Sequence, residues 1–234
     1  MNPTMTYQDK HGQKIDFHIN DGHNKFCVNV SGGADSAVLM YMLITYCQKN
    51  IPDAEIYCIT CANIVKGWYN ARVSSVVIDR LLQLTRTDMI KGHYTYFAED
   101  QTRQELNQFE TKVYDLHKAT YYIHGTTQNP DQSVILTRGG GHAERNNGHN
   151  RPILKSNYMP NDPNTFRYMP LMHVDKRMVS HLYREHKSAD LMTELLPYTR
   201  SCEQHRAENK ENPWMTTECG ECWWCREKAW AFRR

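Results

Sequence analysis

The chain has 234 residues, enough for one domain with a sizeable hydrophobic core. Hydrophobic residues make up 40% of it and aromatic residues 11%, which excludes an intrinsically disordered chain. With 28 basic and 26 acidic residues the formal charge is only +2, so we expect no nucleic-acid partner. The amino terminus has no apolar signal segment, and the longest apolar run, 37–47, is too short to span a bilayer. We therefore expect a cytoplasmic protein with no membrane partner.

Strand-like and helix-like apolar patterns alternate along the first half of the chain. We predict strands at residues 25–30, 54–61, 88–96 and 120–124. We predict helices between them, at residues 36–49, 70–84 and 102–117. This alternation indicates an α/β fold with a parallel sheet, in which the loops that follow the strands lie at one edge.

The remaining segments differ in composition. Residues 1–24 are polar and predict an N-terminal extension of the main domain, which spans 25–199. Within that domain, residues 129–167 are rich in glycine and proline and predict a long loop insert. Residues 200–234 hold the last four cysteines and predict a small C-terminal metal-binding segment.

The sequence SGGADS at residues 31–36 interrupts the apolar pattern directly after the first predicted strand. Paired glycines at such a place can form a plain turn. The alternative is an anion site, because the next helix directs its free N–H groups and positive dipole end at this loop. Glycines let the backbone approach a phosphate closely, and serines add hydroxyl donors. Asp35 would repel phosphate unless a cation lay between them, which indicates a divalent metal such as Mg²⁺.

Four cysteines near the end of the sequence have the spacing C-x16-C-x2-C-x2-C: Cys202, Cys219, Cys222 and Cys225. Two residues between cysteines allow both thiolates to bind one ion, and the upstream cysteine completes a tetrahedral zinc site. An iron–sulfur cluster can use the same spacing and stays the alternative. Disulfides are disfavoured in a cytoplasmic protein. The other four cysteines are scattered and are expected to be core thiols.

The SGGADS loop resembles the pyrophosphate-binding loop of the N-type ATP pyrophosphatases, the PP-loop superfamily. The resemblance implies an enzyme that cleaves ATP between its α and β phosphates and adenylates a substrate. It implies catalytic roles for Asp35, Ser36 and Lys176, although Lys176 is alternatively a solvated lysine at a helix start. The ATP-binding residues that the resemblance implies are Ser31, Gly32, Gly33, Ala34, Asp35, Ser36, Cys61, Ala62, Gly125 and Thr126.

Together, the loop and the four cysteines are similar to the 7-cyano-7-deazaguanine synthase family of queuosine biosynthesis, over residues 25–232. This resemblance implies an ATP-dependent C–N ligase that uses Mg²⁺ and Zn²⁺. Its substrates would be a small-molecule carboxylate, 7-carboxy-7-deazaguanine, and ammonia, and its product a nitrile. After Gly125 the sequence departs from the D-Y-S-G-Y-P-D-C-R stretch of that family, which leaves the substrate open. A homodimer also stays open.

Other functions fit parts of the sequence. A PP-loop enzyme that thiolates tRNA or a small molecule would need a positive face or a catalytic cysteine near the loop, which Cys58 or Cys61 could supply. A reductase that acts on phosphoadenosine phosphosulfate shares the fold. A zinc-knuckle binding module with a decayed loop is the non-enzyme alternative, and the intact SGGADS sequence argues against it.

Overall fold

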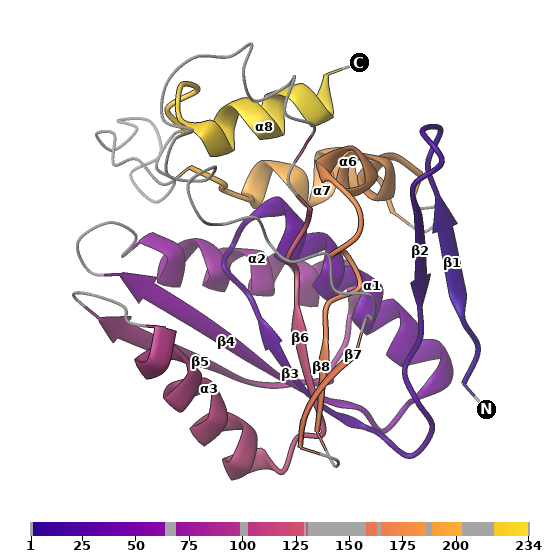
Figure 1. Cartoon of the computed structure of the whole chain (residues 1–234), viewed down its shortest axis with the longest axis vertical. Coiled ribbons are helices and arrows are strands. Elements are labelled where there is room, and N and C mark those ends of the chain that lie inside the picture. The colour runs from indigo at the N-terminus through magenta and orange to yellow at the C-terminus, as the bar shows by residue number, and fades with distance from the viewer. Residues whose placement is uncertain are drawn as a thin grey trace.

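The computed structural model shows a six-stranded sheet with helices on both faces (Figure 1). It describes residues 2–63, 69–98, 103–128, 130, 158–162, 165–185, 189–202 and 218–233. The first elements are β1 (Met5–Gln8), β2 (Lys14–Phe17), β3 (Lys25–Asn29), α1 (Ala34–Asn50), β4 (Glu55–Asn63), α2 (Tyr69–Thr85), β5 (Ile90–Ala98), α3 (Arg103–His117) and β6 (Tyr121–His124). The later ones are β7 (Tyr158–Asp162), β8 (Thr165–Tyr168), α6 (Lys176–Glu185), α7 (Leu191–Glu194), the 3-10 helix η1 (Leu196–Tyr198) and α8 (Trp223–Phe232).

The order of strands in the large sheet is β5-β4-β3-β6-β8-β7. β3 pairs in parallel with β4 and β6, and β5 and β8 extend the parallel sheet on either side. β7 runs antiparallel to β8 at the edge. The α/β parallel fold expected from the sequence is therefore confirmed. The strand order reverses between β3 and β6, and sheets of this type bind ligands at the carboxyl ends of the strands at that point.

The pleat of β3 divides the core into two layers. Phe26 and Val28 pack with residues of α1, α2 and α6, whereas Cys27 packs with residues of α3 and its neighbouring strands. Twelve of the 17 residues of α1 are buried, because α1 contacts the sheet layer, α2 and α6. Its apolar pattern on most faces predicts this burial, and the structure confirms it. Among the described residues, no helix is long and apolar enough to cross a membrane.

The N-terminal hairpin of β1 and β2 is not anticipated by the sequence analysis, which treats residues 1–24 as a polar extension. Exposed and buried side chains alternate along β2, and Ile15 and Phe17 are buried in the main core. The Phe17 ring lies 5.4 Å from the Tyr46 ring of α1 and 5.5 Å from the Tyr168 ring of β8, measured between centroids. The alternation in KIDF is the missed signal, and four residues are too few for it to stand out.

The last part of the predicted loop insert over residues 129–167 is strand rather than loop. It contains β7 and most of β8, and β8 becomes the fifth parallel strand by pairing with β6. Backbone partners on both sides of β8 decide this outcome, since strand formation depends more on the neighbouring strands than on local propensity. Residues 129, 131–157 and 163–164 of the insert lie outside the described part of the chain.

Replacing Phe17 tests whether the hairpin belongs to the core. Phe17→Ala should lower the free energy of unfolding by about 3–5 kcal/mol, because it removes a fully buried ring. Lys14→Ala, on the exposed face of the same strand, is the matched control and should change it by less than about 0.5 kcal/mol. Urea denaturation followed by circular dichroism measures both values. Equal stability of the two variants would contradict the packing described above.

Candidate functional site

A cavity of about 350 Å³, here called the cleft, lies at the carboxyl ends of β3 and β6, where the sheet order reverses. The residues that the sequence predicts for the site and that line the cleft are Ser31, Gly33, Asp35, Ser36, Gly125, Thr126 and Lys176. Gly32 and Ala34 belong to the same loop but do not line the cleft. Cys61 and Ala62 of β4 do not line it either. The tertiary structure thus brings together the loop, the turn after β6 and the start of α6.

The glycines around the cleft serve different purposes. Gly32 has φ +78°, and a Cβ there would lie 2.7 Å from Val73 Cγ1, so the fold itself requires glycine. A Cβ on Gly125 would lie 3.0 Å from Ser36 Cα, so this glycine allows the first turn of α1 to approach the end of β6. Gly33 has an ordinary φ of −76°, and the nearest atom to an added Cβ would be Ser31 Oγ at 3.4 Å. Of the three, Gly33 is the position that the fold leaves free.

The N-terminus of α1 is directed at the cleft without a side-chain cap. Ser36 Oγ donates to the Gly33 carbonyl at 3.1 Å, and Ser31 Oγ lies 3.2 Å from Ser36 Oγ. Both hydroxyls therefore sit beside the first turn of a 17-residue helix. The first-turn N–H groups and the positive end of the helix dipole stabilise negative charge at this place. The arrangement is suited to bind an anion.

Lys176 is a buried cation held between two carboxylates. Its side chain is only 3% exposed, and its Nζ lies 3.2 Å from Asp35 Oδ2 and 3.5 Å from Glu227 Oε2. The alternative that Lys176 is a solvated lysine is therefore wrong. Asp35, Lys176 and Glu227 come from α1, α6 and α8, and no local sequence signal distinguishes Glu227. We call this group the buried charge cluster.

Asp35 offers a place for a cation. Its Oδ2 is paired with Lys176 and accepts a long hydrogen bond of 3.5 Å from Thr127 Oγ1. Its Oδ1 is buried and has no hydrogen-bond partner among the described residues. A buried carboxylate oxygen without a partner is costly, and a hard divalent cation is a ligand that would satisfy it. The carboxylate therefore fits the Mg²⁺ role that the sequence predicts for it.

The sequence analysis does not single out the other residues that line the cleft: Asn29, Asn70, His124, Thr127, Arg200, Ser201 and Trp224. Asn29 and His124 end β3 and β6, so the rule that ligands bind at strand ends could have found them. Arg200 arrives from the segment after η1, and its guanidinium lies 3.9 Å from the centroid of the Tyr69 ring. Only the fold of the later chain brings that residue to the cleft.

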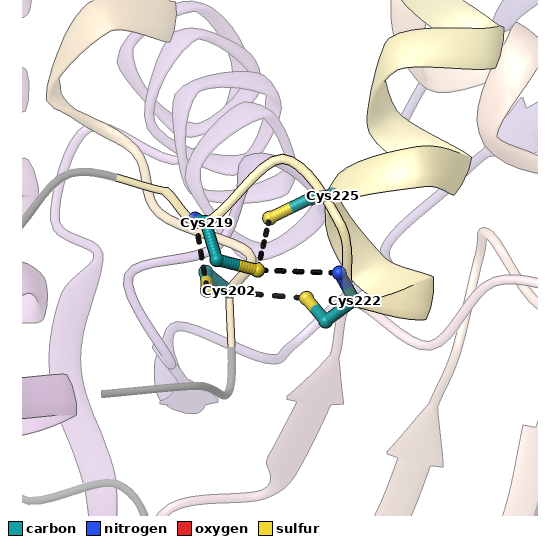
Figure 2. A group of neighbouring side chains, drawn as sticks. All are labelled: Cys202, Cys219, Cys222 and Cys225. Atoms are coloured by element: carbon teal, nitrogen blue, oxygen red, sulfur yellow. Dashed lines mark hydrogen bonds between the residues drawn. The ribbon is translucent and has the colours of Figure 1, made fainter. Parts of the chain in front are cut away.

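The sulfur atoms of Cys202, Cys219, Cys222 and Cys225 lie within 4.8 Å of one another (Figure 2). The Cys219–Cys225 and Cys202–Cys222 sulfur pairs are separated by 3.8 and 3.9 Å, far more than a disulfide bond of about 2.05 Å. Four sulfurs bound to one tetrahedral ion at about 2.3 Å are about 3.8 Å apart. In a four-iron cluster each thiolate binds a different iron, which places the sulfurs further apart. The spacing fits a single metal ion.

Backbone amides around Cys219 favour its thiolate, whereas burial raises the pKa of the Cys225 thiol. The N–H groups of Glu221 and Cys222 donate to Cys219 Sγ at 3.4 and 3.2 Å. Burial raises the pKa of the Cys219 thiol, but these hydrogen bonds outweigh burial and lower its pKa to about 7. Because a thiol must lose its proton to bind a metal, this environment suits a metal ligand.

The cysteine centre shares a wall with the cleft. Cys202 and Trp224 both line the cleft. The Arg200 N–H donates to the Gly32 carbonyl at 2.9 Å, and the Tyr69 hydroxyl donates to the Cys202 carbonyl. The C-terminal segment is therefore bonded to the SGGADS loop and to α2, and it forms one side of the site.

No family model and no curated protein matches the chain. Among solved structures it is similar to the U34-tRNA thiolase NcsA from Methanococcus maripaludis with its 4Fe-4S cluster (17% identity, TM-score 0.44, 71% of this chain and 60% of that chain). It is also similar to FMN adenylyltransferase from Candida glabrata in complex with FMN and an ATP analogue (12% identity, TM-score 0.41, 68% of this chain and 48% of that chain). A third similarity is to NAD⁺ synthetase from Burkholderia pseudomallei (13% identity, TM-score 0.37, 76% of this chain and 66% of that chain). The chain spans between 48% and 66% of the length of these structures.

The two neighbouring glycines of the loop give a direct test of the anion site. Gly33→Val should weaken the binding of inorganic pyrophosphate about tenfold or more while costing less stability than Gly32→Ala, because Gly33 lines the cleft and a Cβ there makes only ordinary contacts. Gly32→Ala should instead lower the melting temperature, because φ is positive and Val73 blocks the new Cβ. Isothermal titration calorimetry and thermal unfolding measure the two effects. Parental pyrophosphate affinity together with the parental number of bound pyrophosphates in Gly33→Val would show that the loop does not hold the anion.

Proposed function

We propose that this protein is an ATP-dependent enzyme of the PP-loop type, which cleaves ATP between the α and β phosphates and adenylates a carboxylate. The observation that carries the proposal is the uncapped N-terminus of α1 in the same cleft as the Asp35–Lys176 ion pair. A helix N-terminus and a lysine bind phosphates, and a carboxylate beside them requires a cation. A cleft of about 350 Å³ is within the range of small-molecule sites.

Each part of the cleft has a role in this reaction. The first-turn amides of α1, with the Ser31 and Ser36 hydroxyls, hold the β and γ phosphates that leave as pyrophosphate. Lys176 stabilises the negative charge that grows on the departing phosphates, while Glu227 forms an ion pair with the same ammonium group and keeps it in position. Mg²⁺ at Asp35, when bound, supplies further neutralisation of the phosphate charge. Catalysis then depends on positioned charges rather than on proton transfer.

We place the substrate in the class of 7-carboxy-7-deazaguanine, with ammonia as the nitrogen donor. A carboxylate oxygen attacks the α-phosphorus and expels pyrophosphate. Ammonia then attacks the acyl carbon, expels AMP and loses a proton, which gives an amide. A second adenylation, on the amide oxygen, followed by loss of AMP and a proton, gives the nitrile. The presence of the SGGADS loop and the four-cysteine centre in one chain supports this choice.

A thiolation or phosphosulfate-reduction function has less support. Such chemistry requires a reactive thiolate or a redox cluster near the nucleotide. Burial raises the pKa of Cys58 to about 12, and burial together with the Glu110 carboxylate raises that of Cys61 to about 12. Both thiols are therefore protonated at neutral pH. The spacing of the four C-terminal sulfurs favours one ion, for which we propose Zn²⁺.

Asp35→Asn tests the cation role. The variant should be less stable than the parent, because Lys176 keeps only Glu227 as a counter-charge. At a temperature where it is still folded, it should lose ATP cleavage about hundredfold or more, because an amide binds Mg²⁺ poorly. The release of AMP and pyrophosphate is measured with a panel of small carboxylates and ammonia. Asp53→Asn, at the exposed turn before β4, is the matched control and should keep the parental rate. Turnover by Asp35→Asn at the parental rate would contradict the proposed site.

The four-cysteine centre gives a separate prediction. Purified protein should contain about one zinc ion per chain and no iron, because four thiolates at this spacing close a tetrahedral site. Elemental analysis and visible absorption measure this directly. Removal of the ion, or Cys222→Ser, should weaken the binding of a non-hydrolysable ATP analogue about tenfold or more, since the centre and the loop share a wall. Zinc added back to the stripped parent should restore binding, and unchanged affinity after stripping would refute the coupling.

A further inference from the structure

A second cavity, of about 310 Å³, lies beside α6 and is here called the basic hollow. The turn between β1 and β2, the helix α6 and the end of α8 converge there. It adjoins the cleft through α6, because Lys176 lines the cleft and the next residue, Arg177, lines the hollow. The basic side chains of the hollow are Lys10, His11, Arg177, His181, Arg184 and Arg233.

The hollow has only two acidic residues among its lining, Asp9 and Glu185, to accept hydrogen bonds from these basic side chains. Asp9 is only 6% exposed, and its carboxylate accepts hydrogen bonds from the N–H groups of His11 and Gln13 and from the Gln13 side chain. These bonds form the turn between β1 and β2. Glu185 is exposed at the end of α6. The hollow therefore holds more donors than acceptors, although the formal charge of the whole chain is only +2.

Part of the hollow is fixed in position by the fold. Arg177 donates to both carboxylate oxygens of Asp175, and its guanidinium lies 5.2 Å from the centroid of the Trp230 ring. Arg184 donates to the Phe232 carbonyl at 2.7 Å. These contacts hold the two guanidinium groups against the wall of the hollow.

Other nitrogen-bearing side chains of the hollow are unpaired within the described part of the chain. Among the described residues, none forms a hydrogen bond or an ion pair with the side chains of Lys10, His181 or Arg233. Fixed guanidinium groups beside unpaired donors from three separate segments create a site for a ligand with many acceptor oxygens. A phosphate group presents such oxygens in all directions, whereas a carboxylate presents two in one plane.

We propose that the basic hollow binds a phosphate group, as a second anion site separate from the cleft. The volume of about 310 Å³ admits a phosphate-bearing small molecule, and the phosphates of a nucleic-acid strand present the same oxygen acceptors. The assignment does not depend on the reaction proposed for the cleft, since no residue lines both cavities.

The test isolates the hollow by blocking the cleft. Gly33→Val protein is titrated with inorganic pyrophosphate by calorimetry. To find out whether the remaining binding takes place in the hollow, His181→Ala and Arg233→Ala are then added together to the Gly33→Val protein. This double variant should weaken pyrophosphate binding about tenfold or more. Lys49→Ala with Lys91→Ala removes two exposed cations elsewhere and should leave it unchanged. Thermal unfolding confirms that each variant is folded.

A second titration, with a short single-stranded RNA, identifies the source of the phosphate. Binding of RNA at least tenfold more tightly than pyrophosphate, lost in the same double variant, assigns a nucleic-acid backbone. If RNA binds less than tenfold more tightly than pyrophosphate, the natural ligand of the hollow is a small phosphate compound. The proposal is overturned if Gly33→Val protein binds neither probe, or if the hollow and control variants bind them equally. Failure of ATP cleavage in the parent protein would refute the proposed function and leave this result intact.

Discussion

The buried charge cluster is the constraint on which the rest of the site depends. An ammonium group that is 3% exposed would cost several kcal/mol without compensation, so Lys176 requires the carboxylates of Asp35 and Glu227 nearby. These three residues belong to α1, α6 and α8. Their attraction fixes three helices from distant parts of the chain around one edge of the sheet. The anion-binding end of α1 thereby comes to face α6 and the C-terminal segment.

The C-terminal segment forms one wall of the cleft. The backbone bond from Arg200 to Gly32 ties this segment to the one loop residue whose conformation only glycine adopts easily. The four cysteines bring the two ends of this segment together, and α8 begins at Trp223, directly after its N-cap Cys222. A metal ion at this centre would therefore fix both the position of α8 and, through Glu227, the counter-charge of Lys176.

The helix α6 presents different chemistry on its two sides. Toward the cleft it offers Lys176, whose ammonium is paired with the carboxylates of Asp35 and Glu227. Toward the hollow it offers Arg177, His181 and Arg184, which are accompanied by donors from the hairpin and from the end of α8. The N-terminal hairpin thus contributes to the core through Phe17 and to the surface of the hollow through its turn.

The sequence alone determined the alternation of strands and helices, the SGGADS loop between the first strand and the first helix, and the spacing of the four C-terminal cysteines, because each is a pattern within a short stretch of the chain. Periodicity and short motifs report local backbone structure, and the parallel sheet then places Gly125 and Thr126 beside the loop. Only the tertiary structure decided that Lys176 is buried, that Glu227 is its second partner and that Arg200 enters the cleft. It also decided that Cys61 and Ala62 stay outside the cleft and that residues 165–168 form the fifth parallel strand. These outcomes depend on contacts between distant segments, where burial and charge pairing act without a local signature.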